Sequence, residues 1–232
     1  MLCPAPVRPR LRARLLVPGA LAAFAGAVVL LAVLHIDRTL APLDPVSTML
    51  SDYALSPGRR LWDGALLLTS TGSALLLVAL YRRGLLAGPV LVAAKALWCV
   101  SLLAVAVFAK DPQGGAITAT GKIHLYASAV TCLSLPVVGW ALGRRHRDDP
   151  HWRRIATWSR RLALAAIPFY LPFIVPFAVN VLGGHLPTVA TGLIERLMMV
   201  LEIALLGVLG CWAHRAMPTG VRFRPRAQVS PG

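Results

Sequence analysis

Six apolar runs occupy nearly the whole chain, and each is long enough to cross a lipid bilayer as a helix. A membrane-spanning helix needs about 20 residues. Lipid offers no partners for backbone N–H and C=O groups, so an unclosed segment satisfies them only as a helix. We therefore predict an all-α polytopic membrane protein, a bundle of six transmembrane helices. The six runs are Leu15–Leu34, Trp62–Tyr81, Leu85–Ala109, Ile123–Leu142, Trp158–Leu182 and Pro187–Trp212.

The composition favours the same class, because 57% of the 232 residues are hydrophobic and only 14% are charged. Soluble domains carry about 25% charged residues. We predict a basic cytoplasmic tail over residues 1–14, a membrane domain over 15–212 and a disordered cytoplasmic tail over 213–232. No small-residue cleavage site follows the first run, which predicts an uncleaved helix. Pro168, Pro172 and Pro176 predict a kink or partial unwinding in the fifth run.

The net charge is +15, and the positions of the basic residues along the chain indicate the membrane topology. Arginines gather at alternate ends of the runs, and basic loops stay in the cytoplasm. This pattern predicts that both termini are cytoplasmic and that the basic ends contact anionic lipid head groups. It gives no reason to expect nucleic acid as a partner. The basic segments are Arg8–Arg14, Arg82–Arg83, Arg144–Arg161 and Arg215–Arg226.

The four cysteines show none of the spacings that hold a metal or build a disulfide framework. Cys3 lies in the N-terminal tail, whereas Cys99, Cys132 and Cys211 fall in three different runs. Zinc sites use close Cys and His pairs. We interpret these cysteines as small packing residues, and we expect neither a bound metal nor another cofactor.

Three unusual loops are predicted to face the outer side together: Leu40–Arg60, Ala109–His124 and Gly183–Arg196. An ionisable side chain near or inside a membrane is costly unless it is paired or faces a polar cavity, so it marks a candidate functional site. We predict one outer pocket that gathers Asp52, Asp111, His124 and Glu195. The full set of candidate binding residues is Ser51, Asp52, Asp111, His124, Glu195 and Arg196.

Each of these residues also has a purely structural interpretation. Ser51 and Asp52 are typical of a helix cap, and Asp111 before a proline is typical of the end of a helix. His124 is compatible with a polar position at the membrane interface, and Glu195 with a pair to Arg196 or to a loop lysine. The predicted convergence of three loops strengthens the case for a functional site, but it does not indicate which reaction takes place there.

Lys95 and Glu202 lie deep in the third and sixth runs, about ten residues from their cytoplasmic ends. At 1.5 Å per residue, both fall about 15 Å deep, near the bilayer centre. Opposite charges at equal depth predict a structural ion pair between neighbouring spans. The alternative is that the third span begins later and that Lys95 reaches back to the cytoplasmic head groups.

Several stretches together resemble the bacterial membrane proteins grouped as domain of unknown function 998. They are PVSTMLSDYALSP, KDPQGGAITATGKIHLYAS and GLIERL, and the resemblance covers roughly residues 15–212. It implies a six-span fold with an outer polar cluster and brings no activity with it. The Ser51–Asp52 loop also resembles, more distantly, that of the Frag1/DRAM/Sfk1 membrane proteins.

Three functions stay open at this point. The first is a non-enzymatic membrane protein whose outer cluster binds a lipid head group, a small solute or a protein partner. The second is a membrane-embedded hydrolase or transferase, with His124 as general base and Asp52, Asp111 or Glu195 orienting it or holding a metal. The third is a transporter, although no inverted repeat is evident. The first is favoured, because the close His spacing of a metal site is absent from the sequence.

Overall fold

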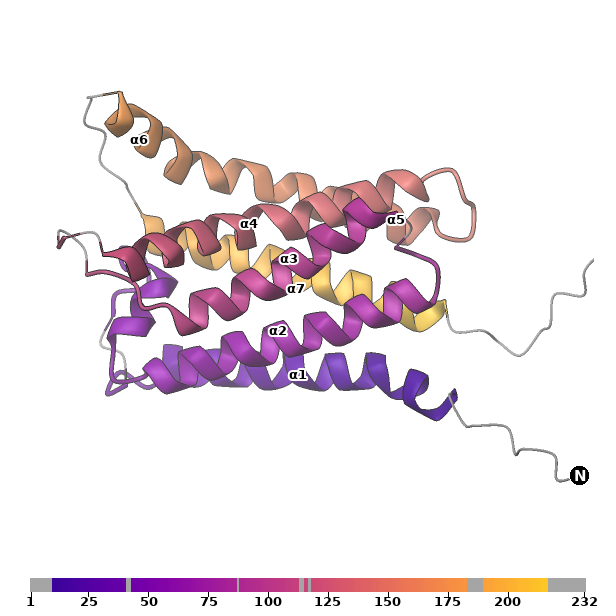
Figure 1. Cartoon of the computed structure of the whole chain (residues 1–232), viewed down its shortest axis with the longest axis horizontal. Coiled ribbons are helices and arrows are strands. Elements are labelled where there is room, and N and C mark those ends of the chain that lie inside the picture. The colour runs from indigo at the N-terminus through magenta and orange to yellow at the C-terminus, as the bar shows by residue number, and fades with distance from the viewer. Residues whose placement is uncertain are drawn as a thin grey trace, which may run out of the picture.

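The computed structural model describes residues 10–40, 43–86, 88–112, 115–116, 118–182 and 190–216, and every regular element in these ranges is helical. The long helices run side by side along one axis (Figure 1). In chain order the elements are α1 (Arg10–Ile36), the 3-10 helix η1 (Leu50–Leu55), α2 (Arg59–Arg82), α3 (Pro89–Val107), α4 (Ala119–Arg145), α5 (Arg153–Ala166), the 3-10 turn η2 (Ile167–Tyr170), α6 (Leu171–Val181) and α7 (Thr191–Arg215).

Four of these helices are long and apolar enough to cross a membrane: Leu15–Ile36 within α1, and all of α2, α3 and α4. The helices extend the predicted runs at several ends. α1 already begins at Arg10, inside the predicted tail, and α7 continues to Arg215. The predicted start of the last run at Pro187 and the rest of the C-terminal tail lie outside the described residues.

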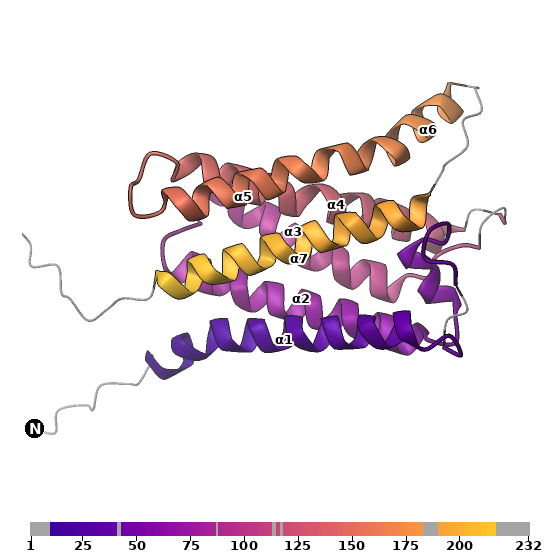
Figure 2. The same cartoon turned by 180° about the vertical axis from the view of Figure 1, so that it is seen from behind.

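The fifth predicted run consists of α5, η2 and α6 in direct succession, and prolines explain the break between them. Pro168 lies in the 3-10 turn and Pro172 in the first turn of α6. Proline has no N–H to donate and its ring displaces the preceding carbonyl, so a helix bends or tightens there. The predicted kink is confirmed. Beyond it, α6 diverges from α4 and α7 (Figures 1 and 2).

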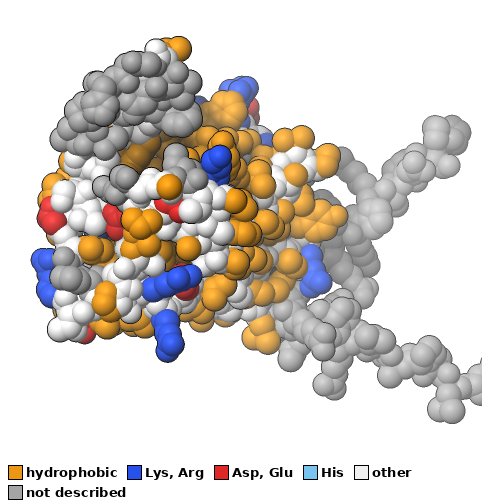
Figure 3. Space-filling model, turned by 60° about the vertical axis from the view of Figure 1, so that its left-hand side comes forward, with side chains coloured by type: hydrophobic (Ala, Val, Ile, Leu, Met, Phe, Trp, Pro, Cys, Tyr) orange, Lys and Arg blue, Asp and Glu red, His pale blue; other side chains and the backbone are white. Residues whose placement is uncertain are grey.

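The two ends of the bundle differ. One end, which we name the η1 end, holds η1 and the α3–α4 connection, whereas the start of α1 and the end of α7 lie at the opposite, terminal end (Figure 1). Polar and charged side chains gather on the η1 end, and hydrophobic side chains cover the flank beside it (Figure 3). A hydrophobic flank beside a polar end is what a lipid bilayer requires of a spanning bundle.

Small residues let the helices approach closely in the half of the bundle nearer the terminal end. Ser159 Oγ of α5 donates to the Gly139 carbonyl of α4 at 2.7 Å. One turn further on, Gly143 lies against the backbone of Ala156. Close helix contacts through small residues are the usual means of association in membranes. The main hydrophobic core fills the same half, and it includes the fully buried Leu76, Leu80, Leu135, Leu142, Leu209 and Trp212.

Candidate functional site

Glu195 and Arg196, at the start of α7, fasten the η1 loop to the bundle. The Leu50 N–H donates to Glu195 Oε2 at 2.5 Å. The Arg196 guanidinium donates to the Thr48 carbonyl at 2.9 Å and, through Nε, to His35 Nε2 of α1 at 3.1 Å. Arg196 therefore connects α1, the η1 loop and α7, and Glu195 is not paired with it.

Lys110 is the cation that pairs with Asp52. Its Nζ lies 2.5 Å from Asp52 Oδ1 and 3.0 Å from Ser51 Oγ. The other Asp52 oxygen accepts from the Met49 N–H at 3.0 Å, so this carboxylate also caps η1, as the structural interpretation expected. Sequence reasoning did not place Lys110 in the site. The available signal was its position directly after an apolar run and directly before Asp111.

Asp111 braces the first turn of α4. Its carboxylate accepts from the Thr118 N–H at 2.8 Å and from Thr118 Oγ1 at 2.7 Å. Thr118 in turn caps the helix by accepting from the Gly121 N–H at 3.0 Å. A Cβ at position 121 would overlap the Asp111 carboxylate, so a larger residue there would displace this carboxylate from its present place. Asp111 is thus held at the helix entrance rather than free in the loop.

His124 lies one turn further along α4 and is 4% exposed. Its Nδ1 is 2.9 Å from the Phe108 carbonyl oxygen. A carbonyl only accepts, so Nδ1 carries the proton in this bond. Nε2 has no hydrogen-bond partner in the part of the chain that the structure describes. The ring is oriented by backbone and not by a carboxylate.

A cavity of about 360 Å³ opens beside these groups, and we name it the outer cavity after the side that the sequence predicts for the three loops. Four predicted binding residues line it: Ser51, Asp111, His124 and Glu195. Asp52 is not in the lining, but it forms an ion pair with Lys110, which is. Arg196 is not in the lining either. The remaining lining is mostly apolar and comes from α4, η2, α6 and α7; it includes Leu125, Ala129, Leu133, Tyr170, Phe173, Ile174 and Met198.

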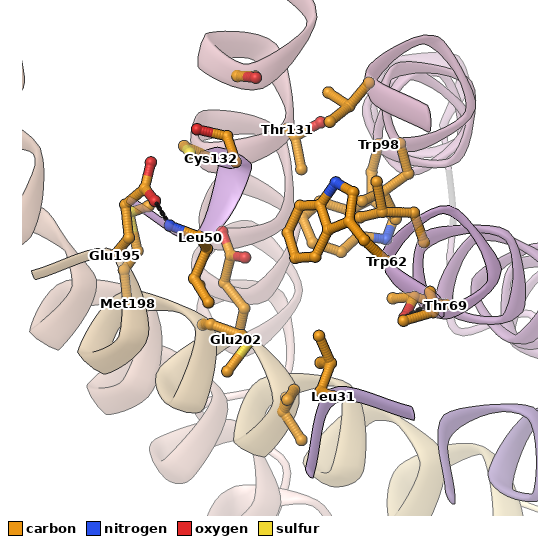
Figure 4. Close-up of a pocket in the computed structure, with 18 of the residues that line it drawn as sticks. Leu31, Leu50, Trp62, Thr69, Trp98, Thr131, Cys132, Glu195, Met198 and Glu202 are labelled. Atoms are coloured by element: carbon orange, nitrogen blue, oxygen red, sulfur yellow. Dashed lines mark hydrogen bonds between the residues drawn. The ribbon is translucent and has the colours of Figure 1, made fainter. Parts of the chain in front are cut away.

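A second space, of about 140 Å³, lies deeper between the helices, and we name it the central cavity (Figure 4). Helices α2, α3, α4 and α7 enclose it, with contributions from α1 and η1. Its polar lining includes Thr69, Thr131, Glu195 and Glu202. The two cavities share the residues Ser51, Ser128, Cys132, Glu195 and Met198, and so they adjoin each other.

Lys95 and Glu202 do not form the predicted ion pair. Lys95 is fully buried, but its Nζ has no hydrogen-bond partner and lies 5.5 Å from the centre of the Trp98 ring on its own helix. Glu202 lines the central cavity, which Lys95 does not. The cavity lies between α3 and α7, and this explains why equal depth did not bring the two charges together.

The described residues contain no group of three or more His, Cys, Asp or Glu side chains placed to hold a metal ion. Cys99, Cys132 and Cys211 are free thiols. Cys3 lies outside the described residues.

A family model described as protein of unknown function (DUF998) matches residues 24–212. The chain belongs to this family. The match starts within α1 and ends at Trp212 in α7, so it covers every residue that lines the two cavities of this DUF998 protein. No curated protein and no solved structure matches the chain.

Proposed function

We propose that this DUF998 protein is a six-span membrane protein that binds a lipid-like amphiphile in its outer cavity. The observation that carries the proposal is the division of that cavity into a polar end and an apolar end. Ser51, Lys110, Asp111, His124 and Glu195 form the polar end, and aliphatic and aromatic side chains form the other. A molecule with a polar head and a hydrocarbon tail matches both ends at once.

The apolar end is positioned to admit a tail from the side. Leu125, Leu133 and Ile174 line it, and they are 54%, 48% and 50% exposed on the flank. The divergence of α6 from α4 and α7 lies on the same side (Figures 1 and 2). Exposed leucine and isoleucine that continue into a cavity form a surface along which an acyl chain can enter from lipid.

The charges at the polar end favour a head group that is not purely anionic. Asp52 already balances Lys110, whereas Asp111 and Glu195 have no cation within 4.0 Å in the described part of the chain. A zwitterionic head group fits this arrangement, because its ammonium can lie towards the Asp111 and Glu195 carboxylates. The Phe108 carbonyl fixes the His124 tautomer with Nε2 unprotonated, so that this nitrogen can accept a hydrogen bond from the head group.

The binding proposal is tested by filling the apolar end. Ala129→Phe adds a ring to the cavity without removing any hydrogen bond, and we expect bound lipid to fall about tenfold, equivalent to about 1.4 kcal/mol. Val137→Phe is the matched control, because Val137 lies on the same helix, is 52% exposed and does not line the cavity. Lipid retained by purified protein is measured by mass spectrometry after incubation with vesicles of phosphatidylethanolamine or phosphatidylglycerol.

The expected order is more phosphatidylethanolamine than phosphatidylglycerol on the wild type and on Val137→Phe, and little of either on Ala129→Phe. Equal lipid on the two variants would contradict binding in this cavity. A preference for phosphatidylglycerol would contradict the zwitterionic head group.

The arginine-rich loops support an orientation in which the η1 end faces the outer side of the membrane. α1, α2, α3, α4, the continuous α5–η2–α6 segment and α7 are the six spans, and the arginine-rich loops lie at the terminal end. We expect reporters fused after Gly143 and after Pro112 to lie on opposite sides, the first in the cytoplasm. Alkaline phosphatase is active only outside the cytoplasm. An active fusion after Gly143 together with an inactive fusion after Pro112 would therefore show the opposite orientation.

A further inference from the structure

Glu202 occupies the middle of α7 and has no role in the binding described above. It lines the central cavity from α7, together with Trp62 from α2 and Thr131 from α4 (Figure 4). Its Oε1 is buried and makes no hydrogen bond in the described part of the chain. A carboxylate at this depth is rare in membrane helices and marks a functional site by default.

No cationic side chain lies among the described residues that line the cavity around this carboxylate. The only charged side chains among the described lining residues are Glu202 itself and Glu195. The other titratable groups close to it are the Cys132 thiol of α4 and the Tyr170 hydroxyl of η2, whereas the faces of α1, α2 and α3 that line the cavity contribute none. An ionised carboxylate in such a place is strongly disfavoured, whereas the neutral acid is tolerated.

Trp62 supplies a second, independent observation. It is 6% exposed, lines the same cavity, and its Nε1 has no hydrogen-bond partner among the described residues. The indole N–H only donates and a carboxylate mainly accepts. The cavity therefore holds an unpaired donor and an unpaired acceptor, two groups that water is able to satisfy together. At about 30 Å³ per water molecule, 140 Å³ has room for a few.

The surroundings of the cavity differ between its two ends. On the side of the η1 end it adjoins the outer cavity, with which it shares Glu195 and Ser128 among other lining residues. Towards the terminal end the route is closed by side chains that have no exposed area, including Leu76, Leu135, Leu209 and Trp212.

We propose that Glu202 is an intramembrane proton-binding site, hydrated through the central cavity and reached only from the η1 end. The proton is the ligand, water bound at Trp62 and Thr131 delivers it, and the packed core prevents its passage to the terminal end. This site adjoins the amphiphile site and shares lining residues with it. The proposal rests on α7 being one of the proposed spans, but it does not require a lipid to be bound.

The test uses dicyclohexylcarbodiimide, a hydrophobic reagent that modifies carboxylic acids only in their protonated form. The acid proton moves to a carbodiimide nitrogen, the carboxylate oxygen attacks the central carbon, and the adduct rearranges to a stable N-acylurea with no leaving group. The wild-type protein is incorporated in liposomes in one orientation, and modified peptides are identified by mass spectrometry. The pH is set independently on each side.

We expect modification of Glu202 at neutral pH. Above its midpoint, modification should fall about tenfold per pH unit on the η1 side, and it should not respond to pH on the terminal side. Glu202→Gln should lose this adduct, and the surface carboxylate Asp63 should show none. Absence of a Glu202 adduct at every pH would overturn the proposal, as would dependence on the terminal-side pH. Protection by Na⁺ or K⁺ at constant pH would also overturn it, by indicating a metal-cation site. The wild type itself carries the decisive readout, so poor folding of a variant does not obscure it.

Discussion

Replacing Arg196 with glutamine is expected to release the η1 loop from α7 and to destabilise the protein by about 3 kcal/mol. The guanidinium donates to the Thr48 carbonyl at 2.9 Å, to His35 Nε2 at 3.1 Å and to the Tyr53 hydroxyl at 3.5 Å. Hydrogen bonds to charged groups contribute about 1.5–3 kcal/mol each, and the loss is not additive. The measurement is thermal unfolding of the purified protein in detergent.

Two further variants separate geometry from charge. Arg196→Lys keeps the charge but has no planar fork to reach α1 and the η1 loop together, so we expect it to recover only a small part of the stability. Arg154→Gln is the control, because Arg154 is exposed on α5 and its replacement removes the same charge. If Arg196→Lys unfolds at the same temperature as the wild type, the positive charge alone holds the loop. The proposed role of the planar guanidinium would then be wrong.

Loss of Arg196 should also affect the cavities. Glu195, the neighbouring residue, holds the Leu50 N–H and lines both of them. If the η1 loop detaches, Ser51 leaves the lining with it. We therefore expect Arg196→Gln to weaken lipid retention as well as stability, whereas Arg154→Gln should change neither.

Much of the helical framework could be predicted from the sequence, because hydrophobicity along the chain is a local property. Three predicted runs each lie within one long helix: Leu15–Leu34 in α1, Trp62–Tyr81 in α2 and Ile123–Leu142 in α4. The break in the fifth run was also predictable, since Pro168 acts on its own turn. The ends of the helices were harder to predict from the sequence. α1 begins at Arg10 because a helix can continue through charged residues beyond its apolar part.

The candidate site was predictable only as a set of loops. Hydropathy gives the depth of a residue but not the direction in which it points around its helix. Lys95 and Glu202 lie at comparable depth, yet the central cavity separates α3 from α7. The Glu195 bond to a backbone N–H and the Lys110 contact with Asp52 depend in the same way on how loops fold against helices. Such contacts join distant parts of the chain, and no local pattern encodes them.

Gly143→Leu is expected to prevent α4 and α5 from packing, with a loss of folded protein greater than any single polar replacement would cause. A Cβ at position 143 would lie 2.6 Å from the Ala156 carbonyl oxygen, a distance that real Cβ atoms do not adopt. A backbone carbonyl cannot rotate away as a side chain can, so the helices must separate. Overpacking usually costs about 1–3 kcal/mol, and a leucine here should reach or exceed the upper value.

Gly207→Leu is the matched control, since Gly207 lies in α7 and a Cβ there meets no atom within 4 Å. It adds the same side chain to a membrane helix, and it should fold like the wild type. Gly143→Ala should lie between the two, because it introduces the clash without the larger side chain. Size-exclusion chromatography of a fluorescent fusion, before and after heating, measures all three. Equal recovery of Gly143→Leu and Gly207→Leu would mean that α4 and α5 are further apart than Gly143 and Ala156 require. The α4–α5 hairpin would then no longer fix where η2 and α6 diverge, and the wall of the outer cavity formed by Phe173 and Ile174 would lose its support.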